Sequence, residues 1–193
     1  MIDKIKEVRE RSSVGLSACK QALEDSHGNV EDALVLLQKR GLAAVKDKTG
    51  DANEGTIRTY RHSNGRMFAA VEVCCQTDFS ARNELFQEFA EQLVLQVASM
   101  DPKYLSSGDV PEDVLEKQRT IFKAQIGDKV PEEKVEHVIN GKMKKWFSEN
   151  CLMDQKSVVV PGGHSMEKLR AELVMKIKEN IVVKRFVRWE VGK

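Results

Sequence analysis

The sequence is poor in cysteine, and its few cysteines form no recognisable framework. Among 193 residues there are four, Cys19, Cys74, Cys75 and Cys151, with no C-x-x-C spacing. Cys74 and Cys75 are adjacent, so on a strand they point to opposite faces and are poorly placed to share one metal ion. We therefore expect free, mostly buried thiols in a reducing cytoplasm, with no metal site and no cofactor.

The sequence also lacks long hydrophobic runs and an excess of charge of either sign. No apolar run approaches the roughly 20 residues that a membrane span needs, and Met1–Lys6 has no apolar region typical of a secretory signal. The 31 basic and 30 acidic residues give a net charge of +1, so no overall field attracts nucleic acid or an anionic membrane. These absences predict a cytoplasmic protein with no membrane association and no direct nucleic-acid partner.

One short segment mixes cations with aromatic residues, which is the composition of some RNA-binding surfaces. In residues 142–147, KMKKWF, a helix would place Lys142 and Lys145 on one face, and Met143 and Trp146 on another. Ordinary amphipathicity therefore explains the segment without nucleic acid.

No motif for covalent catalysis is present. The sequence contains no G-x-x-x-x-G-K-[ST] loop for a nucleoside triphosphate and no nucleophile–base pair. Four histidines are scattered, with none at i, i+4 spacing: His27, His62, His137 and His164. Residues 161–165, PGGHS, precede a predicted helix and could hold an anion at its N-terminus, but a plain turn is the simpler explanation. We therefore expect that the protein is not an enzyme.

Residues 1–45 have the pattern of three short helices that pack on one another. Apolar residues recur at helical spacing, for example Leu16, Cys19 and Leu23, and we expect Gly41 to end the third helix. Some forty residues bury only a small core, so this module should be marginally stable alone. Its size and pattern are typical of ubiquitin-associated (UBA)-like modules, which bind other proteins.

A polar segment separates this module from the remainder of the chain. Residues 46–55 are almost free of apolar side chains, which predicts a linker. Residues 56–193 are then expected to form one core domain. In it, Thr56–His62 alternates as a strand, Asn64-Gly65 predicts a two-residue hairpin turn, and a second strand runs to Cys75.

The rest of the chain reads mainly as helices. Helical patterns cover 84–100, 112–126 and about 132–153, and the last two predict a helical hairpin at about 111–153. Ser157–Pro161 is expected to be a short extended segment, and a further helix is expected to run from Ser165 through Glu179. The apolar stripes predicted for the first two of these helices include Leu85, Phe86, Phe89, Leu93 and Val97, and Leu115, Ile121 and Phe122.

The last segment, from Val182, alternates as a third strand. The predicted fold class is therefore α+β: an N-terminal three-helix UBA-like module, then a core of three-stranded antiparallel sheet packed with helices, plus the helical hairpin.

The junction between the second predicted strand and the helix at 84–100 carries an unusual residue. It reads CQTDFSARN, from Cys75 to Asn83, and places Phe79 in a surface connection. Burying a Phe contributes roughly 1.5–3 kcal/mol relative to exposing it. Either Phe79 folds back onto its own domain, or a partner buries it.

Five segments together resemble the elongation factor Ts family. They are Val8–Arg11 (VRER), Gly15–Leu23 (GLSACKQAL), Leu36–Gly41 (LLQKRG), Val71–Asn83 (VEVCCQTDFSARN) and Glu179–Arg188 (ENIVVKRFVR). Thr77-Asp78-Phe79 in the fourth segment is the most specific motif. The five segments lie in the family's order along nearly the whole chain.

The resemblance implies a guanine nucleotide exchange factor that binds the G domain of elongation factor Tu. It further implies that Asp78 and Phe79 reach toward the Mg²⁺ and phosphate site of that domain. Longer members carry two core repeats, whereas this chain has one, which is similar to the short form that works as a homodimer. The partner-binding residues implied by the resemblance are Arg9, Arg11, Leu16, Ser17, Thr77, Asp78, Phe79, Ser80, Arg82 and Asn83.

The chain departs from the family pattern at three places. Residues 12–18 read SSVGLSA instead of the usual TGAGMMD, so Leu16 keeps an apolar contact whereas Ser17 loses one. Ser80 replaces the usual Val after Phe79. Val187 stands where some short members have a cysteine, so no disulfide can link two copies there.

Two other classes of function compete with nucleotide exchange. A UBA-like module joined to a dimerising core could act purely as a scaffold for a helix-bearing partner. A cysteine- or metal-dependent enzyme would need a low-pKa thiolate or a bound metal, and the cysteine spacing disfavours both.

Overall fold

The computed structural model describes residues 2–12, 16–47, 51–126 and 130–193, and for 42–47 the backbone alone. Part of the segment that departs from the family, part of the predicted linker and the predicted turn of the helical hairpin lie outside the described residues: 13–15, 48–50 and 127–129. Within the described ranges no helix is long and apolar enough to cross a membrane.

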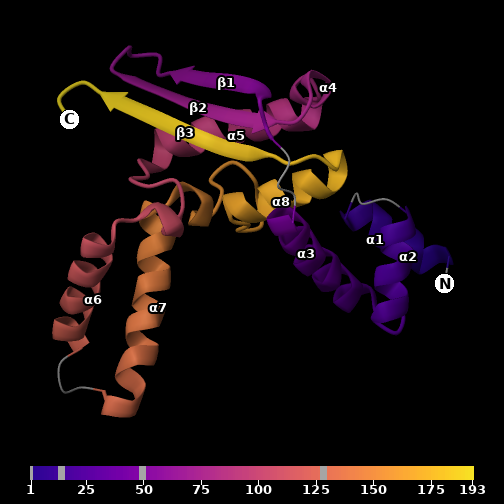
Figure 1. Ribbon diagram of the computed structural model, residues 1–193, viewed down its shortest axis with the longest axis horizontal. Helices are drawn as coiled ribbons and strands as arrows, with labels where there is room; N and C mark the ends of the chain where they lie inside the picture. Colours follow the sequence, from indigo (N-terminus) through magenta and orange to yellow (C-terminus); the bar gives the residue numbers. More distant parts are fainter. Residues whose placement is uncertain (1, 13–15, 48–50, 127–129) are drawn as a thin grey trace. The chain divides into compact units, whose positions relative to one another are not determined.

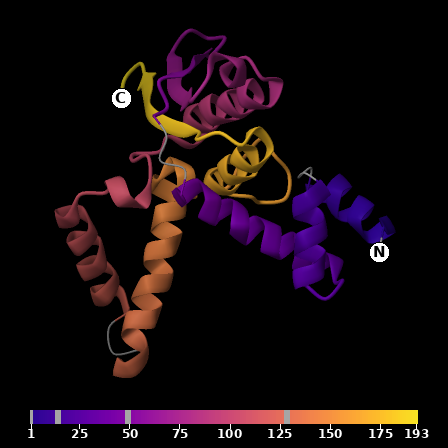
Figure 2. The ribbon, with the colours of Figure 1, turned by 45° about the vertical axis from the view of Figure 1, so that its right-hand side comes forward.

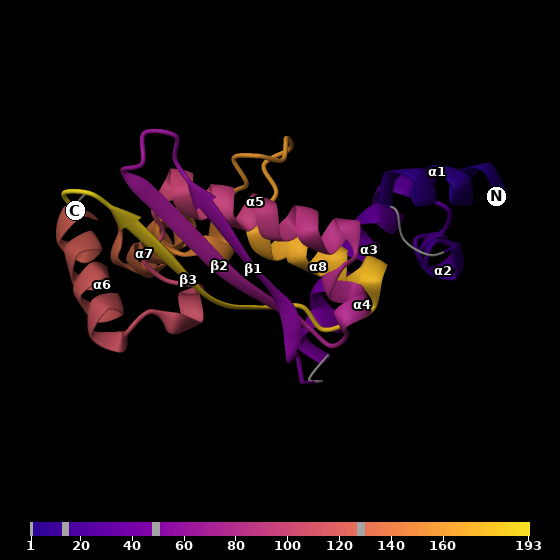
Figure 3. The ribbon, with the colours of Figure 1, turned by 90° about the horizontal axis from the view of Figure 1, so that it is seen from above.

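The chain has an α+β fold, as the sequence predicts (Figure 1). The helices of the described residues are α1 (Ile2–Ser12), α2 (Leu16–Asp25), α3 (Val30–Asp47), α4 (Asp78–Ala81), α5 (Glu84–Met100), α6 (Glu112–Ile126), α7 (Glu132–Asn150) and α8 (Met166–Ile177). The strands β1 (Glu54–Arg61), β2 (Met67–Cys75) and β3 (Val182–Glu190) form an antiparallel sheet in the order β1-β2-β3. Seen from above, β2 lies between its two neighbours (Figure 3).

Contacts divide the chain into two compact units, and each is described by itself. The first unit comprises 1–58, 71–91 and 167–184, and the second comprises 59–70, 92–166 and 185–193. The first unit therefore contains α1 to α4 and α8, and the second contains α6 and α7.

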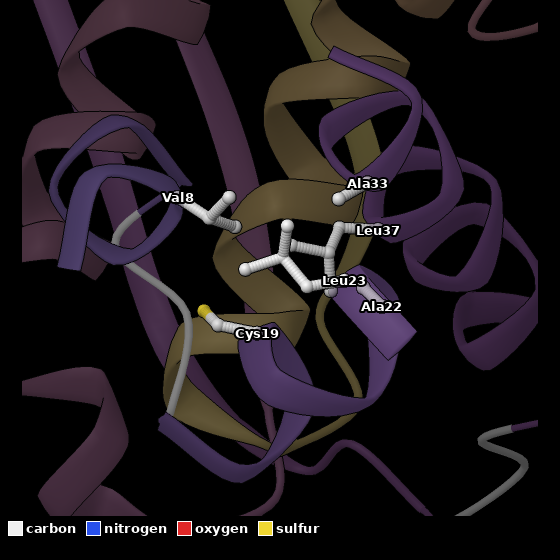
Figure 4. Close-up of a cluster of buried hydrophobic side chains, with 6 residues drawn as sticks. All are labelled: Val8, Cys19, Ala22, Leu23, Ala33 and Leu37. Atoms are coloured by element: carbon white, nitrogen blue, oxygen red, sulfur yellow. The ribbon is translucent and has the colours of Figure 1, made fainter. Parts of the chain in front are cut away.

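The first three helices form a three-helix module with its own small core. Their buried side chains lie together (Figure 4): Val8, Cys19, Ala22, Leu23, Ala33 and Leu37. None of these is more than 3% exposed. Spacings of three and four residues within α2 and α3 place their members on one face, as amphipathic packing requires, and α1 contributes Val8. Met175 of α8 packs against the same core.

The third helix does not stop at Gly41, as the sequence suggested, but continues to Asp47. A glycine inside a helix costs only about 1 kcal/mol relative to alanine, which packing can offset. Gly41 is buried, and a Cβ there would fall against the Met175 sulfur. This glycine therefore permits close approach of α8 and does not act as a stop signal.

The β1–β2 hairpin differs in detail from its prediction. Its turn is longer than two residues, because the His62 amide donates to the Met67 carbonyl at 3.0 Å and the Gly65 amide donates to the His62 carbonyl at 2.8 Å. At the other end, β1 begins at Glu54, before the predicted Thr56. Gly55 has φ +156°, and a Cβ there would collide with the Val73 carbonyl oxygen, so only glycine fits against β2.

The helical hairpin of α6 and α7 is present in the second unit, where the two helices lie side by side (Figures 1 and 2). Ile126, Ile139 and Met143 form its buried centre. Lys142 lies 5.4 Å from the Phe122 ring centroid, a cation–π contact that uses this lysine inside the hairpin.

The predicted stripes are wrong at two positions. Ile121 of α6 is 48% exposed, and Leu85 of α5 is 41% exposed. Helical periodicity gives the direction of a stripe but not its width, and both residues lie at an edge that neighbouring elements leave uncovered.

Two buried glutamines organise the second unit around the segment that was expected to be extended. Gln96 and Gln155 are fully buried, and the Gln96 amide donates to Gln155 Oε1 and to the Lys156 carbonyl, both at 3.1 Å. Gln96 Oε1 accepts from the Val158 amide at 2.9 Å. The Gln96 side chain therefore makes a hydrogen bond that a neighbouring strand would otherwise make. Residues 158–160 form bends, and 157–160 contain no strand.

We predict opposite effects of alanine at two glycines. Gly55→Ala should lower the free energy of unfolding by about 1–3 kcal/mol, because Cβ meets backbone that cannot move aside. Gly141→Ala should raise it by roughly 0.5–1 kcal/mol, because this α7 position has no atom within 4 Å of an added Cβ. Urea unfolding of both variants tests the pair, and a stabilised Gly55→Ala variant would contradict the close approach of β1 to β2.

Candidate functional site

The Thr77-Asp78-Phe79 segment forms a capped turn of helix, where the sequence suggested a plain junction. Thr77 is extended, with φ −127° and ψ 153°, and its side-chain oxygen accepts from the Ser80 amide at 3.2 Å. This is the geometry of a helix N-cap. The four residues of α4 follow directly.

Phe79 points away from its own fold. Its side chain is 82% exposed, the highest value among the large hydrophobic residues of the described chain. On either side of it in sequence, Ser80 is 8% exposed and Asp78 is half-buried. The Asp78 carboxylate pairs with Arg82 at 3.2 Å, one helical turn on. Of the two alternatives for Phe79, burial within its own domain is therefore wrong.

The C-terminal side of the turn is tied to α5. Asn83 Oδ1 accepts from the Leu85 amide at 2.9 Å, which caps the start of α5. The Gln87 side-chain amide donates to the Ala81 carbonyl at 2.6 Å. Both ends of α4 are thus fixed, and the exposed ring stands on a backbone with defined hydrogen bonds.

A residue far along the chain fixes the N-terminal side of the turn. Glu179 Oε2 accepts from the amides of Gln76 and Thr77, each at 3.1 Å, and its Oε1 accepts from the Thr77 hydroxyl at 2.7 Å. The sequence placed Glu179 at the end of the last helix, but α8 ends at Ile177. Lys178 then takes a left-handed φ of +65°, which ends the helix before Glu179.

These contacts shift the pKa of Glu179. Partial burial raises it, but hydrogen bonds from the Thr77 and Ser80 side chains and from the backbone amides of Thr77 and Gln76 together lower it below its ordinary value. The carboxylate form is therefore favoured in the folded state.

The thiol next to the turn is buried and has a raised pKa. Cys75 is fully buried, and its Sγ donates to the Thr77 carbonyl at 3.2 Å. Burial, together with the charge of Glu179, raises the pKa of Cys75 to about 11, and burial with nearby Asp154 and Asp109 raises that of Cys151 to about 12. Among the described residues no group of three or more His, Cys, Asp or Glu side chains could hold a metal ion.

The other predicted site residues lie on the three-helix module. Arg9 is exposed on α1, and Leu16 and Ser17 are exposed in the first turn of α2, with Leu16 at 55%. Arg11 pairs with Glu31 at 2.7 Å and with Glu7 at 3.6 Å. Hydrogen bonding to Glu31 raises the pKa of Arg11, which keeps this surface cation charged.

The predicted residues thus form two groups in the first unit. Hydrogen bonds and ion pairs join the turn residues to one another, but in the described part of the chain none joins them to the module group. The family resemblance predicts both groups. It does not predict the contact of Glu179 with Gln76 and Thr77, since that contact joins residues more than 100 positions apart.

The described part of the chain thus combines a helix-rich α+β fold, a three-helix module and an exposed Thr-Asp-Phe turn. Comparison with known proteins identifies the family to which it belongs. The family model described as elongation factor TS matches residues 39–193. Proteins named elongation factor Ts are similar over nearly the whole chain.

The protein of Thermotoga neapolitana is 44% identical over 192 residues, which are 99% of this chain and 96% of that one. That of Thermoanaerobacter sp. (strain X514) is 42% identical over 190 residues, 97% of this chain and 93% of its own. The chain belongs to the elongation factor Ts family.

The lowered pKa of Glu179 predicts a pH-dependent stability contribution. A carboxylate with a depressed folded-state pKa stabilises above its unfolded pKa, and loses that stabilisation as the pH falls through the folded value. We expect wild-type protein to be more stable than Glu179→Gln at pH 7, and the difference to shrink below about pH 4.5, the ordinary value for this carboxyl. Urea unfolding of both proteins from pH 7 to pH 3.5 measures this, and a constant difference would contradict it.

Proposed function

We propose that this protein is a guanine nucleotide exchange factor that binds elongation factor Tu·GDP and promotes release of GDP. Membership of the elongation factor Ts family supports the partner. The observation that carries the proposal is the Phe79 ring, 82% exposed on a turn held at both ends. Exchange breaks no covalent bond, which agrees with raised pKa values for the thiols of Cys75 and Cys151.

The proposed contact places Phe79 in a pocket of the G domain, with Asp78 beside it near the Mg²⁺ and phosphate site. An exposed aromatic ring that a partner buries is a typical interface anchor. Because the turn is already formed in the free protein, binding has little loop entropy to lose. The negative charge of Asp78 is half-exposed and available to a partner, although it pairs with Arg82 in the free protein.

Phe79 alone is insufficient for exchange. An exchange factor acts through its differential affinity for the nucleotide-free state, and a ten-thousandfold shift requires about 5.5 kcal/mol. Burial of one Phe contributes roughly 1.5–3 kcal/mol. We assign the remainder to displacement of the Mg²⁺ and phosphate-binding groups and to further contacts, including Arg9, Arg11, Leu16 and Ser17 of the module. Thr77, Ser80, Arg82 and Asn83 then serve to hold the turn and border the contact.

The arrangement of the chain around this function is also proposed. Residues 1–45 form the partner-binding module and 56–193 the core. Of the predicted linker 46–55, residues 46–47 belong to α3 and 54–55 to β1. A single core repeat suits a homodimer, in which each copy supplies one half-core. The proposed site of action is the cytoplasm, with no direct contact to nucleic acid or membrane.

Replacing the exposed ring tests the proposal directly. Phe79→Ala should slow release of a fluorescent GDP analogue from elongation factor Tu by about 10- to 100-fold at saturating factor, from the loss of roughly 1.5–3 kcal/mol. Binding to elongation factor Tu should persist, because the other contacts remain. Stopped-flow fluorescence measures the release rate, and titration calorimetry measures binding.

Ile121→Ala provides a matched control. Ile121 is an apolar side chain on the α6 surface with 48% exposure, and its replacement should leave exchange unchanged. Wild-type release rates in Phe79→Ala would contradict the anchor role. Tight binding without any acceleration by the wild-type protein would instead favour the scaffold function.

A further inference from the structure

The carboxylate of Glu179 is placed to control the shape of the exposed turn. Two successive backbone amides, those of Gln76 and Thr77, and the Thr77 hydroxyl donate hydrogen bonds to it. The donors and the acceptor are 102 to 103 residues apart in sequence. Hydrogen bonds to a charged acceptor are about twice as strong as neutral ones. One side chain from the C-terminal segment thus fixes the backbone immediately before α4.

The Thr77 hydroxyl links this carboxylate to the helix cap. A hydroxyl has one proton to donate and lone pairs that accept. The Thr77 hydroxyl donates a hydrogen bond to Glu179 Oε1 at an O–O distance of 2.7 Å. Its oxygen accepts a hydrogen bond from the Ser80 amide nitrogen at 3.2 Å. Glu179 therefore sets the direction of the hydroxyl and leaves its lone pairs facing the first turn of α4.

The segment that carries Glu179 is itself anchored. The Asn180 amide donates to Gln76 Oε1 at 3.1 Å, so the two segments are bonded in both directions. One residue further on, the Ile181 carbonyl accepts from Arg170 Nη1 at 2.8 Å. Arg170 is held in turn by Glu167 of its own helix, at 2.9 and 2.6 Å. Hydrogen bonds to Arg170 of α8 and to Gln76 therefore hold the segment that carries the Glu179 carboxylate.

The turn needs such support. An isolated helix of four residues is unstable in water, because nucleation fixes several dihedral angles for very few hydrogen bonds. Phe79 is 82% exposed, so its side chain contributes little burial to hold α4 in place. Ser80 and Ala81 are buried and hold one side of α4. The caps and the contacts at either end supply the rest of the stabilisation.

We propose that Glu179 is a positioning residue for nucleotide exchange: its carboxylate holds Gln76 and Thr77 so that α4 presents Phe79 in the conformation that a partner binds. This rests on the proposed exchange function. Glu179 acts on the turn through Thr77, and Phe79 makes the productive contact.

A double-mutant cycle on the full-length chain tests the proposal. Glu179→Ala should slow GDP release from elongation factor Tu about tenfold when Phe79 is present. In the Phe79→Ala background the same substitution should slow release by much less than tenfold, because the ring is gone and only the weaker contact of Asp78 is left on the turn to position. Glu179→Gln retains an oxygen for the two amides, so its exchange rate should lie within about threefold of wild type. Glu116→Ala, at an exposed α6 carboxylate, is the matched control and should exchange at the wild-type rate.

A second measurement on the free protein does not depend on exchange. In wild type the Ser80 amide should be protected from hydrogen exchange by its bond to Thr77, and in Glu179→Ala that protection should fall about tenfold. Amides of Val71 and Val73 in β2 should keep their protection in both, which shows that the variant is folded.

The outcomes separate the two proposals. If Glu179→Ala slows release equally with and without Phe79, Glu179 acts independently of the ring and the positioning role is wrong. Unchanged Ser80 protection in a folded Glu179→Ala protein also overturns it. If wild-type protein fails to accelerate GDP release while Ser80 loses protection in the variant, the exchange function fails and the control of the turn by Glu179 stands.

Discussion

The organisation of the site depends on one carboxylate that accepts hydrogen bonds from two adjacent amides and a hydroxyl. The Gln76 and Thr77 amides precede α4 and have no partner within that short helix, and Glu179 satisfies both. An amide without a hydrogen-bond partner lowers the stability of the fold. One carboxylate oxygen that accepts from both amides removes this penalty for the two of them. Further hydrogen bonds connect this point to the helices: the Thr77 side chain caps α4, and the Asn83 side chain caps α5. The backbone on both sides of Phe79 is thus hydrogen-bonded, whereas the Phe79 ring itself is exposed.

Much of the fold could be predicted from local pattern. The bounds of α5 and α6 agree with the periodicity of the sequence, since each is a long amphipathic segment between clear breaks. The errors occur where tertiary packing decides. Gly41 does not end α3, because its missing side chain accommodates Met175. Gln96 organises residues 157–160 across more than 60 positions, which no local pattern reveals.

The site divides in the same way. Phe79 could be singled out because a large apolar residue in a junction is anomalous, and its exposure confirms that the anomaly is real. The helical turn beneath it was not predicted, although Thr77 is a good N-cap residue, since four residues are too few to show periodicity. Glu179 opens a segment that resembles the family, but nothing in that segment indicates a contact with the turn. Only the fold brings it to the turn, so the sequence motif identifies the exposed residue and misses the one that supports its turn.

The separation between Glu179 and its donors has a consequence for how the protein is made. Synthesis proceeds from the N-terminus, so the Thr77 amide emerges from the ribosome 102 residues before the carboxylate that accepts its hydrogen bond. Throughout that interval the turn must rely on water for these hydrogen bonds, while β3 has yet to join the sheet beside β2. Closure of so long a loop is a late, non-local event in folding. The turn that carries the exposed ring therefore acquires these hydrogen bonds only after Glu179 has been synthesised.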